Sequence, residues 1–133
     1  MEYKIELNSE EKVRMDQVRD FYKEEELDKA LPILEELYKS HPLSPMLVAT
    51  LANLHWDLKN ITIAIELFHR AVKLGPESEK ISRGLLHILW EQHDEVSAVK
   101  EIQRFIDTGN ASKEYIEMAL EINLKRDFNI KTV

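Results

Sequence analysis

The sequence predicts an all-α fold in which three antiparallel helix hairpins stack into an α-solenoid and a seventh helix caps the last hairpin. Two observations carry this prediction. The 133 residues include only three glycines and four prolines and are rich in Glu, Leu, Lys and Ala, a composition that favours helices. Similar residues also recur every 34 positions, and a fixed period of that length is typical of stacked helical repeats.

The 34-residue period runs through aromatic, alanine, large apolar and proline positions. The alanines matter most for the fold, because a small residue lets the two helices of a hairpin approach closely and a larger one would overpack the contact. The recurring sets are Tyr22, Trp56 and Trp90; Ala30, Ala64 and Ala98; Leu34, Phe68 and Ile102; Leu37, Ala71 and Phe105; and Pro42, Pro76 and Asn110.

Each copy divides into two helical stretches. Leu47, Leu51, Leu54 and Leu58 of the second copy follow the 4-3-4 spacing of one helix face. Only two or three residues separate the two stretches, which forces an antiparallel hairpin. We expect the first helices at roughly 9–24, 44–58 and 78–92, and the second helices at roughly 27–40, 61–74 and 95–107.

Local signals indicate where these helices begin and end. Ser44 and Pro45 are typical of an N-cap and a first helical position, Ser112 of the N-cap of the last helix, and Gly75 and Gly109 of helix ends that need a left-handed residue. The chain is then one domain, 1–133, which divides into an N-terminal segment (1–10), three repeats (11–44, 45–78 and 79–110), a capping helix (111–126) and a tail (127–133). We expect the tail to be frayed.

The pattern resembles the tetratricopeptide repeat family. In the second copy only His55 departs clearly, because the family has an aromatic residue there. Departures in the first copy are Arg14, Gln17 and Val18, and in the third copy Ser82 and Leu86. Gln17 and Asp20 stand where the second copy has Leu51 and Leu54, as expected of a polar N-terminal cap. The family pattern is matched in the second copy by Val48, Leu51, Ala52, Ala64, Phe68, Ala71 and Pro76.

Composition and charge exclude several classes of partner. A net charge of −7 argues against nucleic acid or an anionic membrane as the main partner. The chain has no cysteine, which removes disulfides, thiol catalysis and zinc–thiolate sites. No apolar run is long enough to span a membrane, and the start, MEYKIELNSEE, lacks the pattern of a secretory signal. We expect a cytoplasmic protein without membrane insertion.

No set of residues converges into a catalytic constellation, so we expect no enzyme activity, no metal and no cofactor. Glu66 and His69 have the spacing of half a di-iron site, but the second motif and the further carboxylates are lacking, so a surface pair is favoured. His55 falls where the family packs an aromatic residue and is expected to be a buried structural imidazole. The acidic run Glu24–Glu26 is expected to be a solvated turn.

The resemblance implies a right-handed superhelix whose concave groove is lined by the first helix of each repeat. Such a groove suits an extended or helical peptide with apolar anchors and an acidic group or a free C-terminus. The carboxylate clamp of heat-shock co-chaperones is not reproduced, because of its five positions (Met15, Arg19, Thr50, Lys80 and Gly84) only Lys80 matches. The groove residues that the resemblance implies are Lys12, Met15, Arg19, Tyr22, Asn53, Trp56, Lys80, Arg83, His87 and Trp90.

The function predicted from the sequence is therefore a non-catalytic protein–protein interaction module, an adaptor or chaperone that binds a segment of another protein. One alternative is an immunity-type antagonist that masks a basic partner with its acidic convex face, carrying residues such as Glu35 and Glu36. A helical enzyme or small-ligand-binding bundle is the alternative from a different class. Homodimerisation through the unpaired end of the solenoid also stays open.

Overall fold

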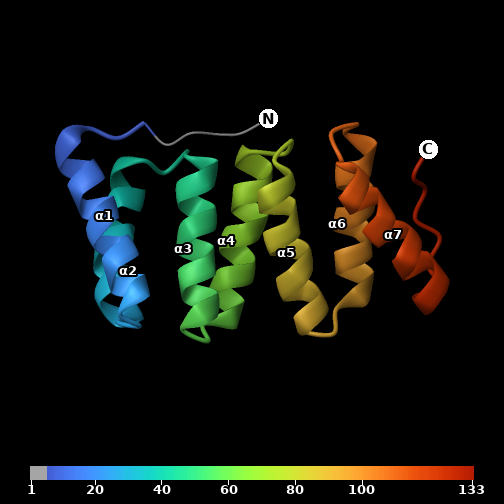
Figure 1. The fold of residues 1–133 in the computed structure, drawn as a ribbon, viewed down its shortest axis with the longest axis horizontal. Helices are drawn as coiled ribbons and strands as arrows, with labels where there is room; N and C mark the ends of the chain where they lie inside the picture. Colours follow the sequence, from blue (N-terminus) through green and yellow to red (C-terminus); the bar gives the residue numbers. More distant parts are fainter. Residues whose placement is uncertain (1–5) are drawn as a thin grey trace.

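The computed structural model describes residues 6–133, and these form seven helices and no strand. Three antiparallel hairpins and a single last helix follow one another along the long axis of the molecule (Figure 1). Their bounds are α1 Ser9–Lys23, α2 Leu27–Ser40, α3 Pro45–Asp57, α4 Ile61–Leu74, α5 Glu79–Glu91, α6 Glu95–Asp107 and α7 Lys113–Arg126. The predicted all-α solenoid is confirmed.

The last helix continues the 34-residue register of the first helices. Ser44, Ser78 and Ser112 are the N-caps of α3, α5 and α7, and each serine oxygen accepts the backbone N–H three residues on. A residue in the left-handed region also recurs one or two positions after the first helix of each copy, at Glu25, Lys59, His93 and Asp127. The sequence predicted a helix here, but not that α7 is the first helix of a fourth copy.

One expectation about glycine is wrong. Gly75 ends α4 with φ −131, which is not left-handed. Gly109 does have a positive φ of 82. The left-handed region is also occupied by Glu25, Lys59 and His93, which lie in the tight turn inside each hairpin, while Gly109 lies in the connection between α6 and α7.

The core lies within and between the hairpins and follows the repeat. Ala30, Ala64 and Ala98 have no exposed surface, as their packing role requires. His55 is buried, and its Nδ1 lies 3.2 Å from the side-chain amide of Asn60. Desolvation by burial lowers the pKa of His55, so the imidazole stays neutral at neutral pH. The expected buried structural imidazole is confirmed.

The two ends of the solenoid differ. On α1, Gln17 and Asp20 are exposed where the second copy buries Leu51 and Leu54, so the first end is polar as predicted. The tail corrects the prediction, because it is folded onto the last helices and not frayed. Ile130 is only 4% exposed and joins the core between α6 and α7.

Among residues 6–133, none of the helices combines the length and the apolar character that crossing a membrane would take.

Candidate partner-binding groove

A first hollow lies among the first helices α1, α3 and α5 and measures about 280 Å³. Tyr22 of α1, Asn53 and Asp57 of α3 and Lys80 of α5 contribute polar groups to it. Burial, together with the negative charge of Asp57, raises the pKa of Tyr22 to about 12, so its hydroxyl keeps its proton and can donate a hydrogen bond. The apolar part of the lining comes from Met46, Ala49, Phe68 and Ile81.

A second hollow, of about 300 Å³, lies between α5 and α7. It is mostly apolar, with basic groups and one acid beside the apolar walls. Arg126 lies over the Trp90 ring, with its guanidinium carbon 5.9 Å from the ring centre. Desolvation, followed by the positive charge of Arg83, lowers the pKa of His87, although the residue as a whole stays exposed. The lining residues are Leu86, His87, Trp90, Met118, Glu121, Ile122, Lys125 and Arg126.

Trp56 of α3 is half-buried. Its ring meets Phe68 edge-on at 6.0 Å between centroids, and its indole N–H donates to Glu91 Oε1 at 3.1 Å. Both interactions are within the chain and join α3 to α4 and α5. Trp56 therefore holds these three helices together and presents only part of its ring to solvent.

The structure gathers only part of the predicted groove set. Tyr22, Asn53 and Lys80 line the first hollow, and His87 and Trp90 line the second. Lys12, Met15, Arg19, Trp56 and Arg83 line neither of them. Lys12 and Arg19 are exposed on α1, with Arg19 3.2 Å from Asp16, and Met15 packs half-buried against the core of the first hairpin.

Arg83 is turned toward the junction of α5 and α7. Its Nε donates to Glu79 Oε2 at 3.1 Å, and its guanidinium carbon is 5.3 Å from the centre of the Tyr115 ring. Glu79 also accepts the backbone N–H of Ser112 at 2.6 Å and the Ser112 hydroxyl at 3.0 Å. The arginine thus helps to position α7, and through α7 the wall of the second hollow.

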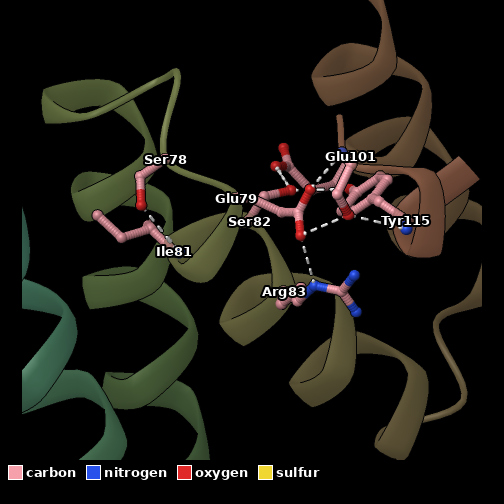
Figure 2. Close-up of polar contacts among 8 residues, drawn as sticks. Ser78, Glu79, Ile81, Ser82, Arg83, Glu101 and Tyr115 are labelled. Atoms are coloured by element: carbon pink, nitrogen blue, oxygen red, sulfur yellow. Dashed lines mark hydrogen bonds and ion pairs between the residues drawn. The ribbon is translucent and has the colours of Figure 1, made fainter. Parts of the chain in front are cut away.

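A buried polar network completes this junction (Figure 2). The Ser82 hydroxyl donates to Glu101 Oε2 at 2.6 Å and lies 2.8 Å from the Tyr115 hydroxyl. Because Ser82 has one proton and gives it to the carboxylate, Tyr115 is the donor to Ser82. Arg104 closes the network with two bonds of 2.7 Å to Glu101. Since α5, α6 and α7 all contribute, the network fixes the shape of the second hollow.

Four residues that α7 gives to the groove were not predicted from the sequence, namely Met118, Ile122, Lys125 and Arg126. The signal that would have found them is the N-cap series Ser44, Ser78 and Ser112, which carries the repeat register into the last helix.

No metal site emerges from residues 6–133, in which no three His, Asp or Glu side chains come together in a way that could hold an ion. The interior is also fully paired within that range, where every buried side-chain nitrogen and oxygen has a hydrogen-bond partner. The two hollows offer apolar contact, hydrogen bonding and charged groups of both signs, with Lys80, Lys125 and Arg126 as the bases and Asp57 and Glu121 as the acids.

Comparison with known proteins identifies the repeat. A family model described as Tetratricopeptide repeat matches residues 15–79 and 49–113. No curated protein matches the chain. Solved structures resemble it at 14–17% identity, which shows the fold alone.

Three such structures cover most of the chain. The first TPR of Spaghetti (RPAP3) bound to the HSP90 peptide SRMEEVD is 17% identical, with a TM-score of 0.71, over 92% of this chain and 100% of that one. The Sgt2 TPR domain from Aspergillus fumigatus is 16% identical, with a TM-score of 0.74, over 96% and 85%. MamA from Desulfovibrio magneticus RS-1 is 14% identical, with a TM-score of 0.73, over 92% and 70%.

Proposed function

The chain belongs to the tetratricopeptide repeat family, and on that premise we propose that it is a non-catalytic adaptor or chaperone that binds a segment of a partner protein in its groove. The groove comprises the first hollow, among α1, α3 and α5, and the second hollow, between α5 and α7. The segment that suits it has an apolar anchor side chain and an acidic group or a C-terminal carboxylate close by.

The observation that carries this proposal is the make-up of the second hollow. Trp90, Met118 and Ile122 offer an apolar volume of about 300 Å³, which suits one large side chain. Lys125 and Arg126 lie in the same lining and supply positive charge for a carboxylate beside that anchor. Glu121 pairs with Lys125 at 2.6 Å, so a bound carboxylate would compete with this exposed pair, which is worth little in water.

The first hollow offers a different set of contacts. The Tyr22 hydroxyl and the Asn53 amide can hydrogen-bond the main chain of a peptide, and the exposed Lys80 can meet an acidic side chain. Met46 adds an adaptable apolar surface. A segment that bridged both hollows would gain from being held at two points.

Gly84 is evidence that the ligand is not held by the clamp with which some tetratricopeptide repeat domains bind the C-terminal carboxylate of heat-shock chaperones. A Cβ at this position would stand 2.5 Å from Phe68 Cε1, so the long basic residue of that clamp does not fit unless Phe68 moves. The HSP90 peptide is a ligand of the RPAP3 domain, and we do not assign it to this chain.

The test is affinity capture from the native cell with wild-type protein and with variants that place glutamates at exposed positions and should leave the fold intact. Lys80→Glu with His87→Glu changes two exposed residues of the groove. Lys39→Glu with His69→Glu is the matched control, because it replaces the same two residue types at exposed positions of α2 and α4. If the proposal is right, the groove double variant recovers at least tenfold less partner than the wild type does. The control double variant recovers as much partner as the wild type.

The opposite pattern would indicate the antagonist alternative. Glu35→Lys reverses an exposed acid on α2, outside both hollows. If Glu35→Lys abolishes recovery of the partner while the groove double variant still recovers it, the acidic surface is the binding face and the groove proposal is wrong.

A further inference from the structure

The segment that follows α7 is held in an extended conformation by two side-chain amides. Asn123 of α7 donates to the carbonyl of Ile130 at 2.9 Å and accepts the Ile130 N–H at 2.7 Å. Gln103 of α6 does the same for Lys131, at 2.9 Å and 2.8 Å. Figure 1 shows this tail running back along α7 after the turn at Asp127.

These four bonds select an extended main chain. In an extended segment the N–H and C=O of one residue point to one side and those of the next residue to the other. Ile130 and Lys131 are consecutive, so their polar groups reach Asn123 on one edge and Gln103 on the opposite edge. A helical segment uses these same groups internally and would satisfy neither amide.

The side chains add an apolar anchor. Ile130 is buried in one cluster with Ile102, Phe105, Tyr115 and Ala119, and Phe128 packs half-buried against that cluster. Because the amides contact only the main chain of the tail, selectivity for sequence rests on Ile130 and, to a smaller extent, on Phe128.

Asn123 departs from the repeat in a way that suits this role. The corresponding places in the first three copies hold Phe21, His55 and Leu89, which are buried or half-buried. In those copies a second helix follows the turn. In the fourth copy the tail follows instead, and the amide at this place binds its main chain.

From this geometry we infer a second peptide-binding site, separate from the groove. We call it the tail slot and define it by Gln103, Asn123 and the apolar cluster that takes up Ile130. Its ligand is an extended segment with an aliphatic anchor two residues after an aromatic one, and the chain's own tail occupies it. A partner segment with this pattern binds when it displaces the tail. The inference does not depend on the groove function.

Displacement is controlled by the local concentration of the tail. A segment tethered through a three-residue turn competes at an effective concentration on the order of millimolar. A free peptide therefore binds weakly to the wild-type chain, where the tail occupies the slot. It binds more tightly when the tail has lost its Ile130 anchor.

The first experiment measures amide hydrogen exchange residue by residue in the full wild-type chain. The Ile130 and Lys131 amides should be protected, Asn123→Ala should accelerate Ile130 more than Lys131, and Gln103→Ala should do the reverse. Gln17→Ala, an exposed amide on α1, should change neither. If both amides exchange at the rate of a free peptide in the wild-type protein, the inference is wrong. That outcome is measured on the wild-type chain and needs no variant.

The second experiment supplies the ligand in trans, as a fluorescent peptide with the sequence of residues 127–133, DFNIKTV. The full-length Ile130→Asp variant should bind it, and the wild-type chain should bind it at least tenfold more weakly. A peptide with aspartate in place of its isoleucine should not bind. Adding Asn123→Ala to Ile130→Asp should weaken binding about tenfold, since two hydrogen bonds are lost.

Two outcomes of the peptide experiment contradict the slot. One is equal binding of the peptide to wild type and to Ile130→Asp, and the other is binding that Asn123→Ala leaves unchanged. Circular dichroism establishes that the variants are folded, and Ile130→Ser replaces Ile130→Asp if the latter loses helix. Lys80→Glu with His87→Glu should leave peptide binding unchanged, so failure of the slot and failure of the groove are distinguished.

Discussion

The hydroxyl groups of Ser82 and Tyr115 lie 2.8 Å apart in the interior, although 33 residues separate them in the chain. Both residues are 0% exposed. Their contact explains why the third copy departs from the family, which has a large residue at the place of Ser82. The ring of Tyr115, which belongs to α7, fills that space. The Tyr115 hydroxyl and the Glu101 carboxylate both form hydrogen bonds with the small polar side chain of Ser82.

Restoring the family residue by Ser82→Leu should therefore destabilise the protein. The larger side chain overpacks against Tyr115 and leaves Glu101 and the Tyr115 hydroxyl without their bonds. We expect the free energy of unfolding to fall by about 2–4 kcal/mol. Tyr115→Phe removes one hydroxyl only and should cost about 1 kcal/mol. Urea denaturation followed by circular dichroism measures both, and a Ser82→Leu variant as stable as wild type would contradict the network.

Arg70 and Arg104 occupy equivalent positions, 34 residues apart, and differ in that only Arg104 also pairs with a buried acid. Each donates to a proline carbonyl, of Pro42 at 3.1 Å and of Pro76 at 2.9 Å. Only Arg104 also holds a buried acid, Glu101, which is 7% exposed. Arg70→Ala should lower the free energy of unfolding by less than about 1 kcal/mol.

Arg104→Ala should cost more, about 2–4 kcal/mol, because Glu101 loses its cation while still buried. Water reaches the partly exposed site of Arg104, which keeps the value below that of a fully buried pair. Adding Glu101→Gln to Arg104→Ala should recover part of the loss. Equal effects of the two arginine substitutions would show that Glu101 does not depend on its ion pair.

The helices could be predicted from the sequence because strong apolar periodicity decides them. The second helix of the second copy was expected near 61–74 and is Ile61–Leu74. The buried place of His55 followed from the repeat in the same way. The register of α7 was harder to predict, because its places hold Tyr115, Ala119 and Leu124 where the other copies differ.

A site residue could be predicted from the sequence only where the repeat places it in the groove and no other contact within the chain draws its side chain away. Arg83 stands at a groove position, but Glu79 and Tyr115 draw it toward α7, and no spacing within α5 indicates that contact. The tail was expected to fray because the last residues of a domain are poorly ordered unless other elements hold them. The two amides that bind its main chain lie on other helices, so the local sequence carries no trace of them.

Stability should depend on pH through His55. Burial lowers the pKa of His55 in the folded state, so below the ordinary value of about 6.5 the unfolded chain binds a proton that the folded chain does not. The free energy of unfolding should therefore decrease as the pH falls from about 7.5 through 6.5, until the lower folded-state pKa is reached. His55→Phe, which restores the aromatic residue of the family, should flatten this decrease.

Denaturation at pH 7.5 and 5.5 checks this dependence as a difference between wild type and variant. The variant removes the contribution of His55 while that of His87, whose pKa is also lowered, remains in both proteins. An identical loss of stability in the two proteins between these pH values would show that His55 is not responsible.

Gly84→Ala should destabilise the protein, against the usual preference of a helix for alanine. In an unobstructed helix interior the change stabilises by about 1 kcal/mol. Here the added Cβ would stand 2.5 Å from Phe68 Cε1 and 3.1 Å from Cδ1, so the ring must move. We expect a net loss of about 1–3 kcal/mol in the free energy of unfolding. Phe68 also lines the first hollow, so the displaced ring should change the fluorescence of Trp56, which it meets edge-on.

The decisive comparison uses Phe68→Leu as the background, since leucine lacks the ring edge that obstructs position 84. Gly84→Ala should stabilise that variant, so the two substitutions are not additive. Gly109→Ala is the matched control. Its Cβ would meet nothing within 4 Å, but φ is +82, so it should destabilise both backgrounds equally by backbone strain. If Gly84→Ala stabilises wild type as well, Phe68 does not press against α5, and the glycine is not what keeps the long basic residue of the heat-shock clamp out of this position.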